Sequence, residues 1–134
     1  MSSFGSIVSR SRCWLGALLL LVSGAGSSFA AELVMFESDI CEWCDAWHAE
    51  IGPIYPKTSE GKRAPLRTVD IHDPRPSDLD HIEGVRFTPT FVLIDDGGQE
   101  VGRINGYPGE DFFWGLLSEL IAKLPRTLKP LTNT

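Results

Sequence analysis

The stretch LVMFESDICEWC, residues 33–44, places two cysteines directly after a short apolar run. The apolar run 33–36 is typical of a buried strand, and Glu37-Ser38-Asp39 is typical of the turn that ends one. From Cys41, apolar residues recur at helical spacing as far as Ile51, and Gly52-Pro53 ends the pattern because proline lacks a backbone donor. The pair is therefore predicted to lie between a strand and the first turn of a helix. This is the context in which Cys-x-x-Cys is a redox pair.

The spacing of Cys41 and Cys44 suits reversible disulfide chemistry. Two intervening residues in a helical turn keep the sulfurs within bonding reach, and Cys41 would lie beside the unpaired N–H groups of the helix start. We therefore expect Cys41 to be the nucleophile and Cys44 to resolve the mixed disulfide. A helix start supplies only about 0.3 to 1 kcal/mol, and neighbouring Glu42 and Asp45 disfavour a thiolate. A mildly acidic Cys41 favours a reductant over a strong oxidant.

Downstream patterns predict an α/β fold with the element order β-α-β-α-β-β-α and a central mixed sheet of about four strands flanked by helices. The remaining elements are expected as a surface connection over Tyr55–Pro65, a strand over Leu66–Ile71, a short helix over Ser77–Ile82, a hairpin of strands Phe91–Ile94 and Glu100–Ile104 joined by Asp95–Gly98, and a final helix whose apolar stripe is Phe112, Leu116, Leu117, Leu120 and Leu124.

The first thirty residues are typical of a cleavable secretory signal. Arg10 and Arg12 precede an apolar run from Trp14 to Val22, and small residues surround a cleavage site after Ala30. Cleavage predicts one exported domain, secreted or periplasmic, over residues 31–134, with Cys41 and Cys44 as its two cysteines. The alternative is an uncleaved N-terminal membrane anchor with the domain facing the periplasm.

Charge excludes one class of partner. The chain carries 12 Lys+Arg against 18 Asp+Glu, a formal net charge of -6, and its basic residues form no stripe. Nucleic-acid binding needs clustered Lys and Arg. We therefore expect no nucleic-acid partner.

A second motif, Phe87-Thr88-Pro89-Thr90-Phe91, puts a proline immediately before an apolar strand. Together with the cysteine pair and the element order, it makes the chain resemble the thioredoxin family. The resemblance implies that Pro89 is a cis-proline facing the cysteines, that Thr88 offers backbone hydrogen bonds to a bound peptide, and that the redox group is the Cys41-Cys44 disulfide without any cofactor. Trp43, between the cysteines, is expected to be exposed as an apolar docking surface.

Further segments, Asp70-Ile71 and Gly106 to Phe113, are similar to the periplasmic thioredoxins of bacterial sulfur-oxidation systems. That resemblance implies a reductase that reactivates the blocked cysteine of a sulfur-oxidation carrier protein. It also implies a membrane thiol-disulfide transporter as electron donor.

The chain departs from cytosolic thioredoxins at two places. Those proteins often carry Gly-Pro between the cysteines and a buried Asp six residues before the first one, where this chain has Glu42-Trp43 and Met35. The usual acceptor for the Cys44 proton is therefore missing. Glu37, Asp39 and solvent remain as unranked substitutes, and His48 is expected to be solvated.

Three rival interpretations remain open. A disulfide oxidase or isomerase on the same fold would differ in reduction potential. A copper- or zinc-binding module would use the thiols as ligands, although the three histidines and one Cys-x-x-Cys are poorly spaced for a structural zinc site. A purely structural disulfide is the weakest, because so short a loop constrains little.

Overall fold

The sheet has four strands and is mixed, as predicted. The structure, a computed structural model, describes residues 30–125. Its strands are β1 (Glu32–Glu37), β2 (Leu66–Asp70), β3 (Thr90–Ile94) and β4 (Glu100–Asn105). They lie in the order β2-β1-β3-β4, with β2 parallel to β1 and both hairpin strands antiparallel to their neighbours. The central strand β1 leads directly into the cysteine pair.

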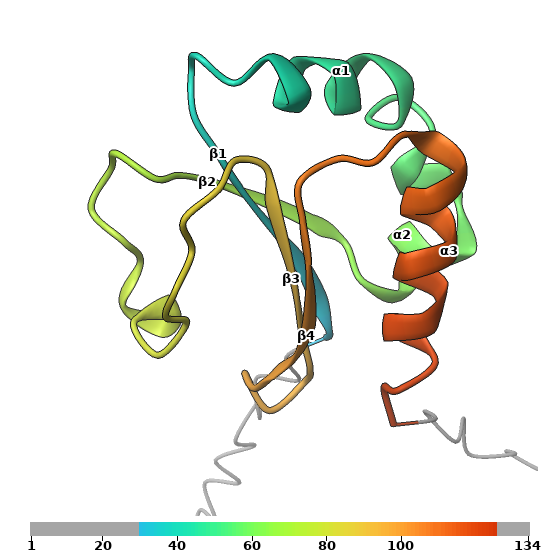
Figure 1. The fold of residues 1–134 in the computed structure, drawn as a ribbon. Helices are drawn as coiled ribbons and strands as arrows, with labels where there is room; N and C mark the ends of the chain where they lie inside the picture. The colour runs from blue at the N-terminus through green and yellow to red at the C-terminus, as the bar shows by residue number, and fades with distance from the viewer. Residues whose placement is uncertain (1–29, 126–134) are drawn as a thin grey trace, which may run out of the picture.

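Helices cover one face of this sheet and an irregular segment covers the other (Figure 1). The helices are α1 (Glu42–Glu50), α2 (Ser59–Arg63) and α3 (Glu110–Ile121), with short 3₁₀ turns η1 (Tyr55–Lys57) and η2 (Ser77–Leu79). The second predicted helix, over Ser77–Ile82, is wrong in extent because only η2 forms there. Leu79 and Ile82 both pack against the sheet, and a 3₁₀ turn aligns side chains three residues apart.

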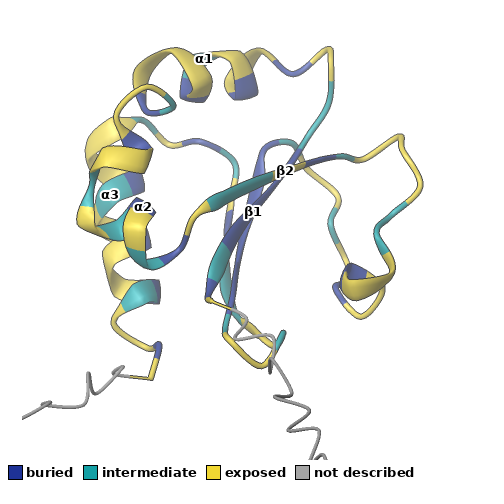
Figure 2. Cartoon of the chain, turned by 180° about the vertical axis from the view of Figure 1, so that it is seen from behind, coloured by how far each residue is buried: buried dark blue, intermediate teal, exposed yellow. Residues whose placement is uncertain are grey.

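Alternation along β1 divides the core into two layers. Leu33 and Met35 belong to the layer beneath the helices, whereas Val34 and Phe36 pack with Leu79 and Ile82 under segment 71–89. Successive side chains of a strand point to opposite faces, so a run of four apolar residues fits a strand that is buried on both sides. Figure 2 shows the buried sheet between its two exposed coverings.

The region Tyr55–Pro65, predicted as a surface connection, contains η1 and α2 and is anchored in the core by three buried residues, Tyr55, Gly61 and Ala64. Tyr55 is buried and its hydroxyl donates to the Ala64 carbonyl at 2.7 Å. Thr58 caps α2 by accepting a hydrogen bond from the Gly61 N–H at 3.0 Å. The Tyr55 ring also stacks on Trp114 of α3, with ring centroids 6.1 Å apart. The charged residues and glycine of this segment are typical of a loop, but the buried Tyr55 side chain holds the segment against the core.

We expect Tyr55→Phe to lower the free energy of unfolding at neutral pH by about 1 kcal/mol, since it removes one buried hydrogen bond. Burial, and then the Glu60 carboxylate, raise the pKa of Tyr55 above its ordinary value of about 10. The wild-type tyrosine therefore stabilises the fold fully below about pH 10, and this stabilisation is lost as the pH rises further. Denaturant titrations from pH 8 to 11 should show a shallower alkaline loss in the variant. An unchanged alkaline slope contradicts the assignment.

The final helix exposes two residues of its predicted apolar stripe. Phe113, Leu117, Leu120 and Leu124 are buried, but Phe112 is 70% exposed and Leu116 also faces outward. The prediction was wrong for these two because consecutive apolar residues give the helix two comparable faces. Packing of Phe113 on Phe91, with ring centroids 5.0 Å apart, selects the face that meets the sheet.

Candidate redox-active site

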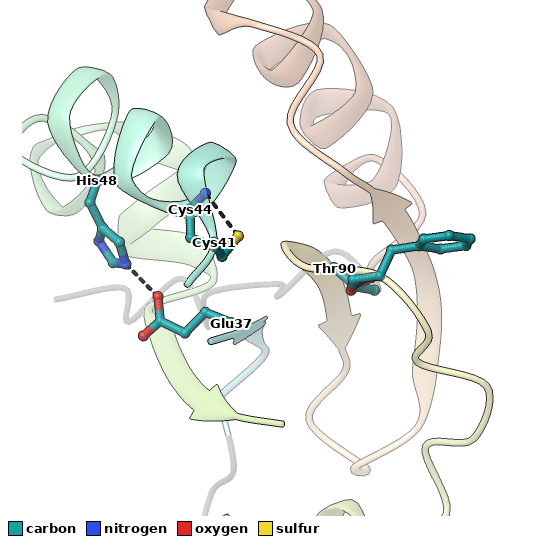
Figure 3. Close-up of a disulfide and its surroundings, with 6 residues drawn as sticks. Glu37, Cys41, Cys44, His48 and Thr90 are labelled. Carbon is teal, nitrogen blue, oxygen red and sulfur yellow. Dashed lines mark hydrogen bonds and ion pairs between the residues drawn. A yellow bond between two sulfur atoms is a disulfide. The ribbon is translucent and has the colours of Figure 1, made fainter. Parts of the chain in front are cut away.

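Cys41 and Cys44 form a disulfide at the start of α1. Their Cα atoms are 5.1 Å apart. Cys41 is the N-cap of the helix, and the Cys44 backbone N–H donates to Cys41 Sγ at 3.1 Å (Figure 3). The Cys41 N–H itself donates to the Ser38 carbonyl at 3.1 Å, which closes the loop that leads out of β1. The predicted position between strand and helix is confirmed.

The two sulfur atoms have different surroundings. Cys41 Sγ already accepts a backbone N–H at the positive end of the helix dipole, and both favour a thiolate once the disulfide is reduced. Cys44 lies inside the first turn, and both cysteines are buried, at 6% exposure for Cys41 and 2% for Cys44, so the N–H donor and the position at the helix start distinguish Cys41. Glu42 and Asp45, both exposed in that turn, work against a thiolate at either sulfur.

The core beneath α1 holds this arrangement in place. Trp47, three residues beyond Cys44, is fully buried and contacts Phe91 and Phe113 with ring centroids 5.3 and 5.7 Å away. Such aromatic pairs contribute about 0.5 to 1.5 kcal/mol each beyond their burial. The helix that carries the cysteines is therefore anchored on β3 and α3.

The Thr88-Pro89 loop lies at the same end of the sheet as the cysteines. Phe36, at the end of β1, pairs with Thr90 at the start of β3. The peptide bond between Thr88 and Pro89 is cis, as predicted. The Pro89 carbonyl accepts the Gly106 N–H at 2.7 Å, and the Thr90 hydroxyl donates to the Phe87 carbonyl at 2.7 Å. These bonds fix the loop on the β3-β4 hairpin.

Large apolar side chains are exposed beside these two segments. Trp43 is 61% exposed, as predicted, and Ile40 and Phe87 are 91% and 65% exposed. Ile40 precedes the first cysteine and Phe87 precedes the Thr88-Pro89 bond. Ile40 and Phe87 were not predicted as site residues. A large apolar residue within a turn was the sequence feature that could have indicated each of them. Exposed apolar groups of this size are typical of interaction sites.

His48 is paired rather than simply solvated. Its Nε2 lies 2.5 Å from Glu37 Oε2, and Figure 3 shows the Glu37 side chain reaching from the end of β1 to α1. Met35, at the place where cytosolic thioredoxins carry a buried Asp, is fully buried in the apolar core. Of the three candidates named for the Cys44 proton, Glu37 is thus the one that the fold ties to the cysteine helix.

Residues 30–125 contain no group of three or more His, Cys, Asp or Glu side chains arranged to hold a metal ion. Within the same residues, no helix is both long and apolar enough to cross a membrane. The predicted signal peptide lies outside the described part of the chain except for Ala30.

A Cys-x-x-Cys disulfide at the start of the helix that follows β1, with a cis-proline loop at the same end of the sheet, defines a thiol-disulfide oxidoreductase whose redox group is its own disulfide. Residues 30–121 match the family model described as a thioredoxin-like domain, and the chain belongs to that family. No curated protein matched the chain.

Among solved structures, the chain is 49% identical to the periplasmic thioredoxin SoxS from Paracoccus pantotrophus. That match covers 69% of this chain and 97% of the other, with a TM-score of 0.65. A mutant thioredoxin from Halobacterium salinarum is 25% identical, covering 69% of this chain and 75% of its own, with a TM-score of 0.52. A thioredoxin from Malassezia sympodialis, 22% identical over 70% of this chain and 77% of its own, has the same fold with a TM-score of 0.52.

Proposed function

We propose that the protein is a periplasmic thiol-disulfide reductase of the sulfur-oxidation type. The observation that carries the direction of the reaction is the environment of Cys41 Sγ, which has one backbone N–H donor but acidic neighbours at Glu42 and Asp45. This stabilises a thiolate modestly, which suits a reductant, whereas a strong oxidant needs a heavily stabilised thiolate. The 49% identity to a periplasmic thioredoxin supports the compartment.

The reaction proceeds in two exchanges. The Cys41 thiolate attacks one sulfur of a substrate disulfide, and the other substrate sulfur leaves as a thiolate. Cys44, deprotonated, then attacks Cys41 Sγ in the mixed disulfide, and the second substrate sulfur leaves. The substrate gains two electrons and two protons, and the protein is left with the Cys41-Cys44 disulfide.

Three further residues bind the substrate in this proposal. Trp43 supplies an exposed apolar surface beside the sulfurs. Thr88 and Pro89 form the opposite wall, where the Thr88 backbone pairs with an extended substrate segment around its cysteine. Main-chain pairing of this kind gives affinity without demanding one substrate sequence.

The substrate we propose is the blocked cysteine of a sulfur-oxidation carrier protein. Residues 1–30 act as the signal peptide that delivers the domain to the periplasm. That compartment is oxidising, so the protein needs an electron donor to return to the dithiol form. A membrane thiol-disulfide transporter fills that place.

The equilibrium reduction potential of the Cys41-Cys44 couple tests the direction. We expect a value at or below about −220 mV in dithiothreitol buffers, followed by tryptophan fluorescence. A value above about −150 mV contradicts a reductase and indicates an oxidase or isomerase. Release of the blocking group from the carrier protein, measured by mass spectrometry with the reduced protein and with its Cys41→Ser variant, tests the substrate.

A further inference from the structure

We propose that His48 accepts the proton of Cys44 when Cys44 closes the disulfide, and that Glu37 positions the imidazole for this step. The inference rests on the proposed roles of Cys41 as nucleophile and Cys44 as resolving residue. It assigns a function to a side-chain pair that the exchange chemistry itself does not use.

The placement of the pair follows from helical geometry. His48 lies four residues after Cys44 on α1, and side chains at this spacing are neighbours on one helix face, with Cβ atoms about 5 to 6 Å apart. Figure 3 shows the imidazole one turn along the helix from Cys44. The side chains of His48 and Glu37 are 42% and 24% exposed, so water reaches the pair. In the proposed step, one water carries the proton between the thiol and the imidazole.

Glu37 selects the form of the imidazole that can accept a proton. An ionised carboxylate only accepts hydrogen bonds, so at 2.5 Å from Glu37 Oε2 the Nε2 atom of His48 is the one that carries hydrogen. In the neutral ring the other nitrogen, Nδ1, then has the free lone pair. A carboxylate that fixes the ring tautomer and stabilises the imidazolium is the usual partner of a proton-accepting histidine.

Charged and aromatic groups from several elements surround the pair. Asp45 lies three residues before His48 on α1. Asp70 is the register partner of Glu37 in β2, and its carboxylate accepts the backbone N–H of His72. The Trp47 ring meets the imidazole edge-on at 5.3 Å and brings no charge. Met35, buried in the same core cluster as Cys44, offers no ionisable acceptor.

In the mixed disulfide, the Cys44 thiol transfers its proton through water to His48 Nδ1, and the Cys44 sulfur attacks Cys41 Sγ. The Cys41-Cys44 bond forms while the bond from Cys41 to the substrate breaks, and the substrate sulfur leaves with the electron pair. His48 then returns its proton to the substrate thiolate through solvent.

The test uses a symmetrical aromatic disulfide that releases one coloured thiolate at each exchange. Attack by Cys41 releases the first equivalent, and closure by Cys44 releases the second. At pH 7 we expect His48→Gln to slow the second release about tenfold and to leave the first unchanged. Glu37→Gln should slow the second release less, because the histidine remains but loses its orientation. The second-release rates of His48→Gln and the wild type should converge as the pH rises beyond about 8.5, the ordinary cysteine pKa, because a thiol then ionises without a base.

His72→Gln is the matched control, since this histidine is exposed and offers only its backbone N–H to Asp70. Its two releases should equal those of the wild type. An unchanged second release in His48→Gln, or a slowing that is equal at all pH values, overturns the inference while a normal first release leaves the proposed function intact. Absence of the first release from the wild type overturns both.

Discussion

Cys44→Ser should accumulate a covalent adduct with its substrate, whereas Cys41→Ser should form none. Without Cys44 the mixed disulfide on Cys41 has no resolving thiol, so it persists until an external thiol reaches it. Without Cys41 the exchange does not begin, because Cys41 Sγ, and not Cys44 Sγ, accepts the backbone N–H at the helix start that favours a thiolate. Both variants should lose turnover by at least about a thousandfold.

Non-reducing gels and intact mass spectrometry of the reduced variants, incubated with a disulfide-containing protein, measure this difference. The double variant Cys41→Ser with Cys44→Ser is the control for trapping at other sites. Equal trapping by the two single variants would contradict the assigned roles, and trapping by Cys41→Ser alone would reverse them. Far-ultraviolet circular dichroism checks that each variant is folded.

Gly61→Ala should destabilise the fold by about 3 kcal/mol, a large share of the roughly 5 to 10 kcal/mol typical of such a domain. A Cβ atom added at Gly61 would lie 1.9 Å from the Tyr55 carbonyl oxygen and 2.7 Å from its carbon. These are backbone atoms, so no rotamer change relieves the overlap. Either α2 or η1 must move, and the buried Tyr55 ring would move with it.

Gly115→Ala is the matched control in α3. A Cβ atom there meets nothing within 4 Å, and alanine favours a helix over glycine, so this variant should gain about 0.5 to 1 kcal/mol. Urea titrations of both variants and the wild type give the comparison. A Gly61→Ala variant as stable as the wild type would mean that α2 is not packed on η1 as described.

Local motifs carried most of the correct predictions. The cis bond before Pro89 was implied by the resemblance to the thioredoxin family, whereas the start of α1 beside Cys41 and the hairpin turn between β3 and β4 each depend on a few adjacent residues. The fold class followed from their order. Features that depend on a few adjacent residues can therefore be predicted from the sequence alone.

The errors arose where distant segments decide the outcome. Phe112 and Phe113 are equally apolar, and only the position of Phe91 on β3 determines which one is buried. The charged stretch after Tyr55 is typical of a loop, and its attachment to the core depends on the stacking of Tyr55 on Trp114 of α3. The partner of His48 is eleven residues away on another element, and no periodicity relates the two.

Helices cover one face of the sheet and the irregular segment 71–89 covers the other, and each covering carries a different part of the site. The cysteines stand on the half secured by helices and by the Trp47 contacts, whereas the Thr88-Pro89 loop ends segment 71–89, whose regular structure is the single turn η2. Segments with few regular backbone hydrogen bonds open at lower free energy than helices and strands. If the Thr88-Pro89 loop binds substrate as proposed, the adjoining segment 71–89 is the part that can adjust to partners of different shape, whereas the helices keep the geometry of the two sulfurs constant.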